Sequence, residues 1–375
     1  MSDATLSVPP SPARLVSLDA LRGFDMLWIV GGGAVAKALR GFGDVPVTAW
    51  LATQFEHVAW EGIHIEDLIF PLFVFIAGAS LVFALTKTVE LRGRAYAARR
   101  VVVRSVILFA IGVIYSGGFE KGLGSVRWLG VLQRIALAYL GAGLLFLVLK
   151  PRGLIAACLT LLLGYWALLS FVPVPEFGAG DFAESHNLAN HLDRLYLPGR
   201  RYNGDHDPEG LLSTLSAIAT CLLGVFAGLH LRRGASACAA RWLFIAGVLL
   251  LCAGWAWSPW LPVIKKIWTP SYVLVAGGWS AILLGLFHWM VDVRGWQRQV
   301  TPFVWIGLNP ITIYLVASLV SYSQLASRFT GGDLQRWLNT SVHPGVGDLL
   351  TALVALSFSV LLAWFLNRRK IYLRV

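Results

Sequence analysis

The stretch from Leu68 to Leu85, LIFPLFVFIAGASLVFAL, carries no charged residue and is nearly long enough to cross a bilayer as one helix. It belongs to one of about ten apolar runs of spanning length, which we place at 18–38, 66–87, 101–118, 128–149, 153–172, 211–231, 242–258, 271–291, 302–320 and 347–367. These runs predict an all-α, polytopic membrane protein with about ten transmembrane helices. We expect a single transmembrane domain over 1–375, with 173–210 as a long periplasmic loop within it.

The composition supports the membrane assignment and argues against a soluble or disordered chain. Hydrophobic residues make up 57% of the sequence, charged residues 14%, and the mean hydropathy is +0.68. Soluble domains are typically about 45–50% apolar and about 25% charged. So few charges do not cover the surface of a soluble protein of this size, and disorder requires far less apolar content.

The net charge of +11 reflects the orientation of the chain in the membrane rather than a nucleic-acid partner. Most of the basic residues lie in short loops between apolar runs, which is the positive-inside pattern, and no basic-aromatic motif for nucleic acid is present. More of the basic residues fall in the loops on the same side of the membrane as the amino terminus than in the loops on the opposite side. We therefore expect both termini to be cytoplasmic. Residues 1–17 show no removable signal peptide, and membrane lipids are expected neighbours.

Charged residues inside the apolar runs are candidates for function because they are costly in a membrane. Asp19, Arg22 and Asp25 share one helix face, either as a structural ion pair or as a surface for a cytoplasmic substrate. Arg104 lies one turn into its run, where it either extends to the interface or binds an anion. Arg134 lies deeper, so we expect a carboxylate or a ligand beside it.

The densest polar cluster, residues 55–67, precedes the uncharged run on the outer side. Asp67 at a helix start has a structural explanation, since the helix dipole favours an acid there. Alternatively, a carboxylate beside His57 orients the ring and makes it a base. A metal site of His57, His64 and Asp67 is a weaker alternative, because the spacing matches no metal motif, and we expect no metal.

Two later motifs have both structural and functional readings. The turn that contains Asp207 and Glu209 either starts the next helix or contacts a polar substrate on the outer side. Asn309 precedes Pro310 inside an apolar run, and Pro310 either kinks the helix or opens polar groups to a central cavity.

Several of these segments resemble the heparan-α-glucosaminide N-acetyltransferase family and its bacterial relatives. The first block, at residues 14–23, is shared with a broader group of membrane acyltransferases, whereas the histidine–tryptophan–glycine stretch and the block that follows it are more specific. The similar blocks follow one another in the family's order, at residues 14–23, 57–62, 66–78, 130–134, 207–214 and 307–311.

The resemblance implies acetyl transfer from cytoplasmic acetyl-CoA, as co-substrate, to the amine of a glucosamine-type sugar on the periplasmic side of a bacterial inner membrane, by a homodimer. The family's catalytic histidine falls on His57 and its aspartate on Asp67. The histidine acts either as a general base or as a transiently acetylated nucleophile. Glu61 replaces an uncharged polar residue of the lysosomal enzyme, and that enzyme's large additional amino-terminal domain is absent from this sequence.

The resemblance also suggests binding roles for the charged residues described above. CoA binding is assigned to Arg22, Arg104, Arg134 and Asn309, with Arg99 or Arg100 as further phosphate ligands and Arg134 or Asn309 beside the thioester oxyanion. Acceptor binding is assigned to Glu61, Asp19, Asp207 and Glu209. Two alternatives stay open at this point: an amino-sugar transporter or permease, and a membrane O-acyltransferase of an envelope polysaccharide.

Overall fold

The computed structural model describes residues 15–43, 46–232, 234 and 236–372. Most of the segment 1–17, for which we expect no signal peptide, lies outside the described residues. The regular elements of this part of the chain are all helical. They are α1 (Val16–Arg40), α2 (Pro46–Gln54), α3 (Glu66–Tyr115), η1 (Leu123–Ser125), α4 (Val131–Val148), α5 (Pro151–Phe171), α6 (Leu188–Tyr196), α7 (Thr214–Leu231), α8 (Ala237–Trp257), α9 (Pro270–Phe287), η2 (His288–Val293), α10 (Thr301–Leu308), α11 (Pro310–Leu319), α12 (Tyr322–Thr330), α13 (Asp333–Ser341) and α14 (Val346–Arg368).

Seven helical segments of the described residues are long and apolar enough to cross a membrane, namely α3, α4, α5, α7, α8, α9 with η2, and α14. The faces of α5, α8 and α14 are largely uncovered by other helices, and exposed apolar side chains such as Leu159, Leu249 and Leu361 line them. Apolar surface on this scale requires a lipid environment. The prediction of an all-α, polytopic membrane protein is therefore confirmed.

Helix α3 covers two of the predicted runs. Its backbone breaks at Gly93, where φ is +81° and ψ is 170°, so α3 consists of two helices joined by a sharp turn. Glycine adopts this φ without the steric cost that a Cβ atom brings. The turn is rich in basic residues, and it places the arginines of the second helix beside the uncharged first helix.

Helices α10 and α11 form one broken span. They meet at Asn309 with a bend of 82° between their axes, where the sequence predicted one run with a kink. Pro310 has no N–H to donate and its ring disfavours a helical conformation at the preceding residue. Asn309 accordingly has φ −134° and ψ 47°, outside the helical region of either neighbouring helix.

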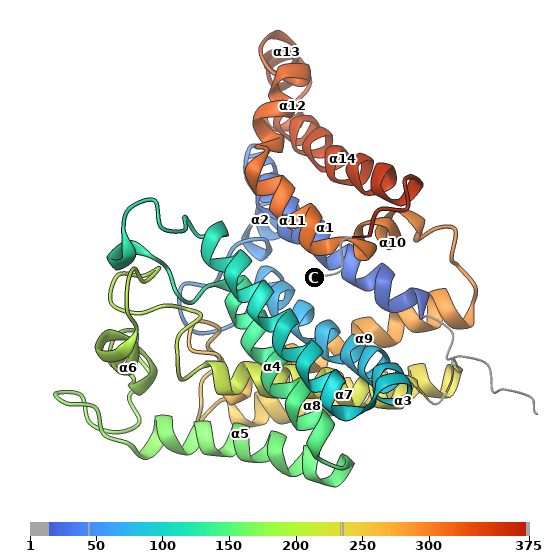
Figure 1. The fold of residues 1–375 in the computed structure, drawn as a ribbon. Coiled ribbons are helices and arrows are strands. Elements are labelled where there is room, and N and C mark those ends of the chain that lie inside the picture. Colours follow the sequence, from blue (N-terminus) through green and yellow to red (C-terminus); the bar gives the residue numbers. More distant parts are fainter. Residues whose placement is uncertain (1–14, 44–45, 233, 235, 373–375) are drawn as a thin grey trace, which may run out of the picture.

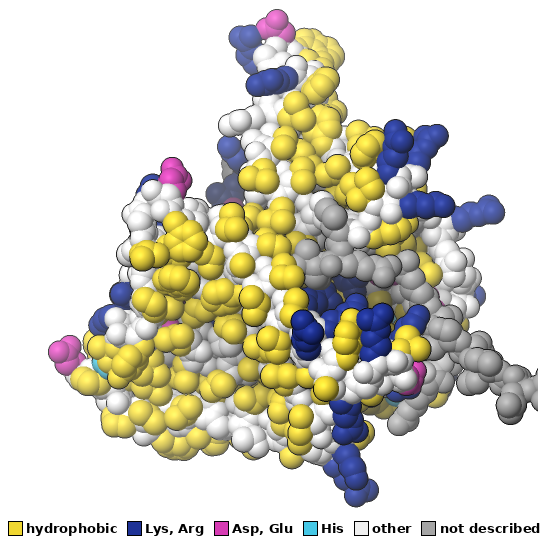
Figure 2. Space-filling view, viewed as in Figure 1, with side chains coloured by type: hydrophobic (Ala, Val, Ile, Leu, Met, Phe, Trp, Pro, Cys, Tyr) yellow, Lys and Arg dark blue, Asp and Glu magenta, His cyan; other side chains and the backbone are white. Residues whose placement is uncertain are grey.

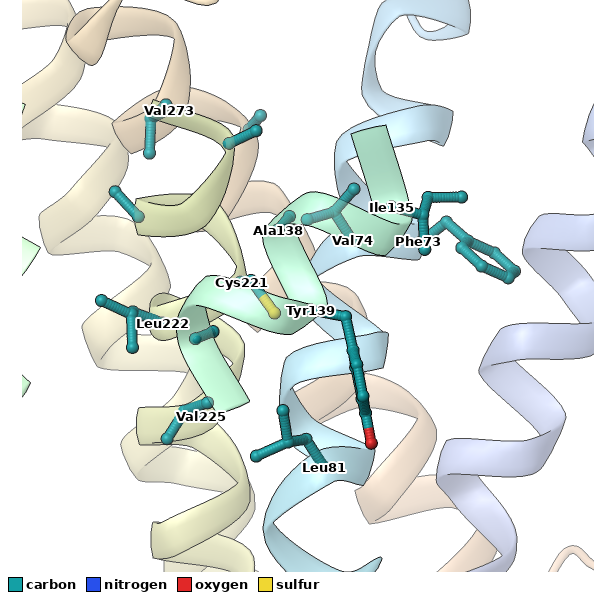
Figure 3. Close-up of a cluster of buried hydrophobic side chains, with 14 of the residues drawn as sticks. Phe73, Val74, Leu81, Ile135, Ala138, Tyr139, Cys221, Leu222, Val225 and Val273 are labelled. Carbon is teal, nitrogen blue, oxygen red and sulfur yellow. The ribbon is translucent and has the colours of Figure 1, made fainter. Parts of the chain in front are cut away.

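The core of the bundle lies where α3 packs against α4 and α7. Figure 3 shows this contact, with Phe73 and Val74 of α3 near Ile135 of α4 and with Cys221 of α7 close by. The backbones approach closely because Gly78 faces the carbonyl of Cys221, as small residues allow in membrane bundles. In Figure 1, α1, α11 and α14 lie above these helices in the view, and α5 and α8 lie below them.

The segment 173–210 is ordered around the short helix α6. The Asn187 side chain caps this helix by accepting a hydrogen bond from Asn190 N at 3.0 Å. Trp60 Nε1 donates to the carbonyl of Phe182 at 2.9 Å, so the segment packs against the loop that carries His57. The following helix begins at Thr214, three residues later than the sequence suggested.

Candidate active site

The loop between α2 and α3 brings His57 to Asp67 at the first turn of α3. The distance between His57 Nδ1 and Asp67 Oδ1 is 3.0 Å. Asp67 is buried, with 1% of its side chain exposed, whereas 59% of the His57 side chain is exposed. A buried carboxylate thus holds one nitrogen of an imidazole whose other face is open to solvent, which is the base–orienter geometry that the sequence predicted.

Asp67 is held in place by several further hydrogen bonds. Its Oδ2 atom accepts from the backbone N–H groups of Val58 at 3.2 Å and His64 at 3.0 Å. Its backbone carbonyl accepts from the hydroxyl of Tyr272 on α9 at 2.6 Å. The loop before α3 therefore fixes the carboxylate of Asp67, α9 fixes its backbone, and the direction of the His57 ring follows from them.

Lys265, from the loop between α8 and α9, is the residue that sequence reasoning missed. Its Nζ atom lies 3.0 Å from His57 Nδ1 and 3.2 Å from Asp67 Oδ1. No local pattern links this lysine to a histidine 208 residues away, and the sequence shows only a Lys265–Lys266 pair in an outer loop. The site is thus a cluster of one imidazole, one carboxylate and one ammonium group.

A short stretch of backbone pairing joins the two loops. Gly62 N donates to the carbonyl of Val263 at 2.9 Å, and Glu61 forms an antiparallel bridge with Ile264. Gly62 has φ +106°, a conformation that suits glycine. This pairing sets the distance between His57 and Lys265, and it leaves the Glu61 side chain exposed next to the site.

His64 does not join this cluster through its side chain. Its Nδ1 atom lies 2.9 Å from the backbone carbonyl of Glu56. Among the residues that the structure describes, no three or more His, Cys, Asp or Glu side chains are placed to hold a metal ion. The alternative of a metal site at His57, His64 and Asp67 gains no support from this arrangement.

A pocket of about 840 Å³ is lined by residues of α1, α3, α4, α10 and α11. Figure 2 shows basic side chains gathered beside a hollow on one face of the molecule. The lining is strongly basic, with one acid among the charged residues: Asp19, Arg22, Arg99, Arg100 and Arg104. Phe73 also lines the pocket, six residues from Asp67 on α3, or about 9 Å along the helix axis.

The arginines of this pocket are partly held by groups of the protein. Arg22 donates to Asp19 Oδ1 at 3.2 Å, to the carbonyl of Gly307 at 3.1 Å and to the Ser80 hydroxyl. The guanidinium of Arg104 lies 4.7 Å from the centre of the Tyr139 ring, and its buried Nε atom has no hydrogen-bond partner within the described residues. The structure therefore brings Arg22 and Arg104 together, as their common assignment expected. Asp19, which was assigned to the acceptor, lies in this basic pocket and pairs with Arg22.

Asp207 and Glu209 lie elsewhere, in a buried ion-pair network. Arg127 donates to Asp207 Oδ1 at 2.7 Å and to Glu209 Oε2 at 2.6 Å. Burial opposes ionisation, but the hydrogen bonds and charge of Arg127 lower the pKa of Asp207, whereas burial raises the pKa of Glu209. The two carboxylates face Arg127 rather than an open cavity, and Asp207 does not cap a helix.

Arg134 and Asn309 do not line the arginine-rich pocket. Arg134 is fully buried and donates to the Gly210 carbonyl and the Ser213 hydroxyl. Its guanidinium lies 4.9 Å from the ring centre of Trp268, and its Nε and Nη1 atoms have no hydrogen-bond partner among the described residues. The sequence led us to expect a carboxylate or a ligand beside it, and the carboxylates of Glu209, Asp193 and Asp207 interact with its charge.

Comparison with known proteins finds similarity to one family. The sequence model described as "Heparan-alpha-glucosaminide N-acetyltransferase, catalytic" matches residues 14–187. The chain is 28% identical to the heparan-alpha-glucosaminide N-acetyltransferases of Homo sapiens, over 99% of its length, and of Mus musculus, over 97%. The chain is thus similar to the heparan-α-glucosaminide N-acetyltransferase family over nearly all of its length.

The match to this family covers the two parts of the site unequally. The chain spans 61% of the length of each of these curated relatives. The matched catalytic region contains His57, Asp67 and the pocket arginines, but it ends before Lys265. The loop that completes the His57 cluster therefore lies outside the part of the N-acetyltransferase family that the model describes.

Proposed function

We propose that this protein transfers an acetyl group from acetyl-CoA to the amine of a glucosamine-type sugar. The observation that carries this proposal is that one helix, the part of α3 before Gly93, borders two features. The His57–Asp67 pair lies at its first turn, and its residues from Phe73 to Ala84 line the pocket whose arginines come from α1 and from the part of α3 after Gly93. A bulky anionic donor in the pocket and an amino sugar beside His57 would thus approach the same span from different sides.

The pocket supplies what the donor requires. CoA carries several phosphates, and arginine guanidinium groups bind phosphate through paired hydrogen bonds. We assign this role to Arg22, Arg99, Arg100 and Arg104. The apolar residues deeper in the pocket, such as Phe73 and Ile135, suit the pantetheine arm, which directs the thioester towards His57.

His57 supplies the chemistry at the outer end. When Nδ1–H donates to Asp67, the lone pair of Nε2 is available to take a proton from the attacking amine. The new N–C bond forms as the C–S bond breaks, and the proton on Nε2 passes to the departing sulfur to give CoA thiol. Alternatively Nε2 itself attacks the thioester, and the acetyl-imidazole then passes its acetyl group to the amine.

The acceptor and the surroundings of the protein complete the proposal. Glu61 is exposed beside His57, so its carboxylate is placed to attract an amino sugar in its ammonium form before deprotonation. We further propose that both termini and the arginine-rich pocket face the cytoplasm and that His57 faces the periplasm, in a homodimer in a bacterial inner membrane. Arginine-rich short loops on the pocket side support this orientation.

The test is an assay of thiol release by the purified protein with acetyl-CoA and glucosamine. We expect free CoA thiol and an amide product, and we expect neither with N-acetylglucosamine, whose amine is blocked. Without an acceptor, one thiol per protein indicates the acetyl-histidine route and none indicates direct transfer. Uptake of glucosamine into vesicles without thiol release, as by a transporter, contradicts the proposal. An ester product contradicts the amine acceptor and indicates an O-acyltransferase.

A further inference from the structure

The chain turns back on itself after α14. Lys370 has φ +57°, in the left-handed region, and Ile371 N donates to the carbonyl of Leu366 at 2.9 Å. These features end the helix and reverse the direction of the backbone. Figure 1 shows the chain leaving the end of α14 towards α10 and the middle of the bundle.

The broken span holds this C-terminal segment, residues 370–372, in place. The side-chain amide of Asn309 donates to the carbonyl of Ile371 at 3.0 Å. Asn309 itself is fully buried at the bend between α10 and α11. Because a buried amide that loses its partner costs free energy, this bond fixes the position of the segment relative to the pocket that Gly307 and Pro310 also line.

Tyr372 contributes a ring to the arginine-rich pocket. Three tyrosines line this pocket, and two of them are already covered, since Arg92 lies over Tyr96 and Arg104 lies over Tyr139. Tyr372 is 38% exposed, and within residues 15–43, 46–232, 234 and 236–372 no other aromatic ring or guanidinium stacks on it. Its hydroxyl donates to Asn367 Oδ1 at 3.3 Å, which orients the ring from its edge.

An open aromatic face in a pocket of arginines matches a particular ligand chemistry. Arginines bind the phosphates of a nucleotide, while an aromatic ring stacks on its base. We propose that Tyr372 stacks on the adenine base of the CoA donor, a proposal that rests on the function proposed above. The C-terminal segment is then a wall of the donor site, and Asn309 is a positioning residue that acts through Ile371.

The experiment compares two acetyl donors on the full-length protein. Acetyl-CoA carries the nucleotide, and acetyl-pantetheine presents the same thioester without it. We expect Tyr372→Ala to raise KM for acetyl-CoA roughly 5- to 100-fold, the range that loss of one base–aromatic stack gives, with kcat and the KM for acetyl-pantetheine unchanged. Tyr372→Phe, which keeps the ring, restores most of the affinity.

Two controls separate the ring from general damage near the C-terminus. Phe365→Ala removes an exposed aromatic side chain from α14 that does not line the pocket, and it leaves both KM values unchanged. A chain that ends after Tyr372 behaves as the full chain, whereas one that ends after Lys370 behaves as Tyr372→Ala. Asn309→Ala raises KM for acetyl-CoA in the same selective way.

The outcomes are distinguishable from a failure of the proposed function. If the wild-type protein transfers acetyl groups but Tyr372→Ala raises neither KM, or raises both equally, the stacking role is wrong and the transferase assignment stands. If the wild-type protein neither binds CoA nor releases thiol, the transferase assignment fails, and the role of Tyr372 fails with it.

Discussion

The Nδ1 atom of His57 lies 3.0 Å from Asp67 Oδ1 and 3.0 Å from Lys265 Nζ. A neutral ring nitrogen either donates or accepts a hydrogen bond, so it engages one of these partners at a time. Donation to Asp67 leaves Nε2 as the base. Acceptance from Lys265 places the proton on Nε2 and removes the base. Lys265 and Asp67 therefore compete for control of the tautomer.

In the proposed function, the exposed imidazole of His57 is the group on which transfer depends. We expect His57→Ala to lower the rate of thiol release by about 10²–10⁴-fold, the contribution of a positioned general base, and by more if an acetyl-histidine forms. The fold persists, because the His57 side chain is largely exposed. The matched control is His186→Ala, which removes a half-exposed histidine paired with Asp181. Near-full activity of His57→Ala contradicts the assignment.

Two adjacent lysines offer a matched pair of variants. Lys265→Met removes the ammonium group beside His57 and Asp67, so we expect the pH profile of kcat to change, since the ring loses a competitor for Asp67. Lys266→Met removes a pair with Glu184, 2.9 Å away, outside the cluster, and we expect little change. Equal effects of the two substitutions on the pH profile of kcat mean that Lys265 acts only on the loop structure.

At the scale of elements, helices approach most closely where glycines replace side chains. A Cβ atom at Gly23 of α1 would collide with the backbone carbonyl of Phe303 on α10, and one at Gly307 would collide with the carbonyl of Asp19. Backbone atoms do not yield as the end of a flexible side chain does. This crossing lies beside Arg22, so it also sets the width of the arginine-rich pocket.

One helix provides both the variant and its control. We expect Gly23→Ala to destabilise the protein by about 1–3 kcal/mol, the range for overpacking, and to weaken binding of CoA by separating α1 from α10. Gly33→Ala lies on the same helix with no neighbouring atom within 4 Å, and it changes stability by less than about 0.5 kcal/mol. Thermal unfolding in detergent measures both. Equal melting temperatures rule out the close crossing.

The sequence predicted the membrane spans and the His57–Asp67 pair. It did not predict contacts between residues that lie far apart in the chain. The uncharged run after Asp67 identified α3, and the resemblance to the N-acetyltransferase family paired His57 with Asp67. Lys265 was not predicted because no periodicity connects loops on different helices. Arg127 went unnoticed in the same way, so Asp207 was interpreted as a possible substrate contact before its buried ion pair was known.

Across the whole molecule, one buried acid links stability to pH. Burial raises the pKa of Asp193 to about 6, despite hydrogen bonds from the N–H groups of Leu211 and Asp207 and the charge of Arg134. The unfolded value is about 3.9. Between about pH 4 and 6 the native state thus keeps a proton that the unfolded chain has lost. The free energy of unfolding therefore falls as pH rises through this window and is flat above it.

The variant that tests this linkage is Asp193→Asn, which does not titrate. From pH 4 to 6 we expect wild-type stability to decline by roughly 1–3 kcal/mol relative to the variant. Thermal unfolding curves across this range give the comparison. Other titrating groups, among them Asp207 and Glu209, contribute to both proteins and cancel in the difference. Parallel curves for the two proteins show that Asp193 titrates normally.

The pairing of Gly62 with Val263 also has a consequence for biosynthesis. A ribosome makes the chain from the amino terminus, so His57 and Asp67 emerge long before Lys265 and Tyr272, which complete their surroundings. A nascent polypeptide that ends after α8 lacks the Gly62–Val263 pairing and the ammonium group of Lys265. The surroundings of the imidazole are therefore complete only in the last third of translation.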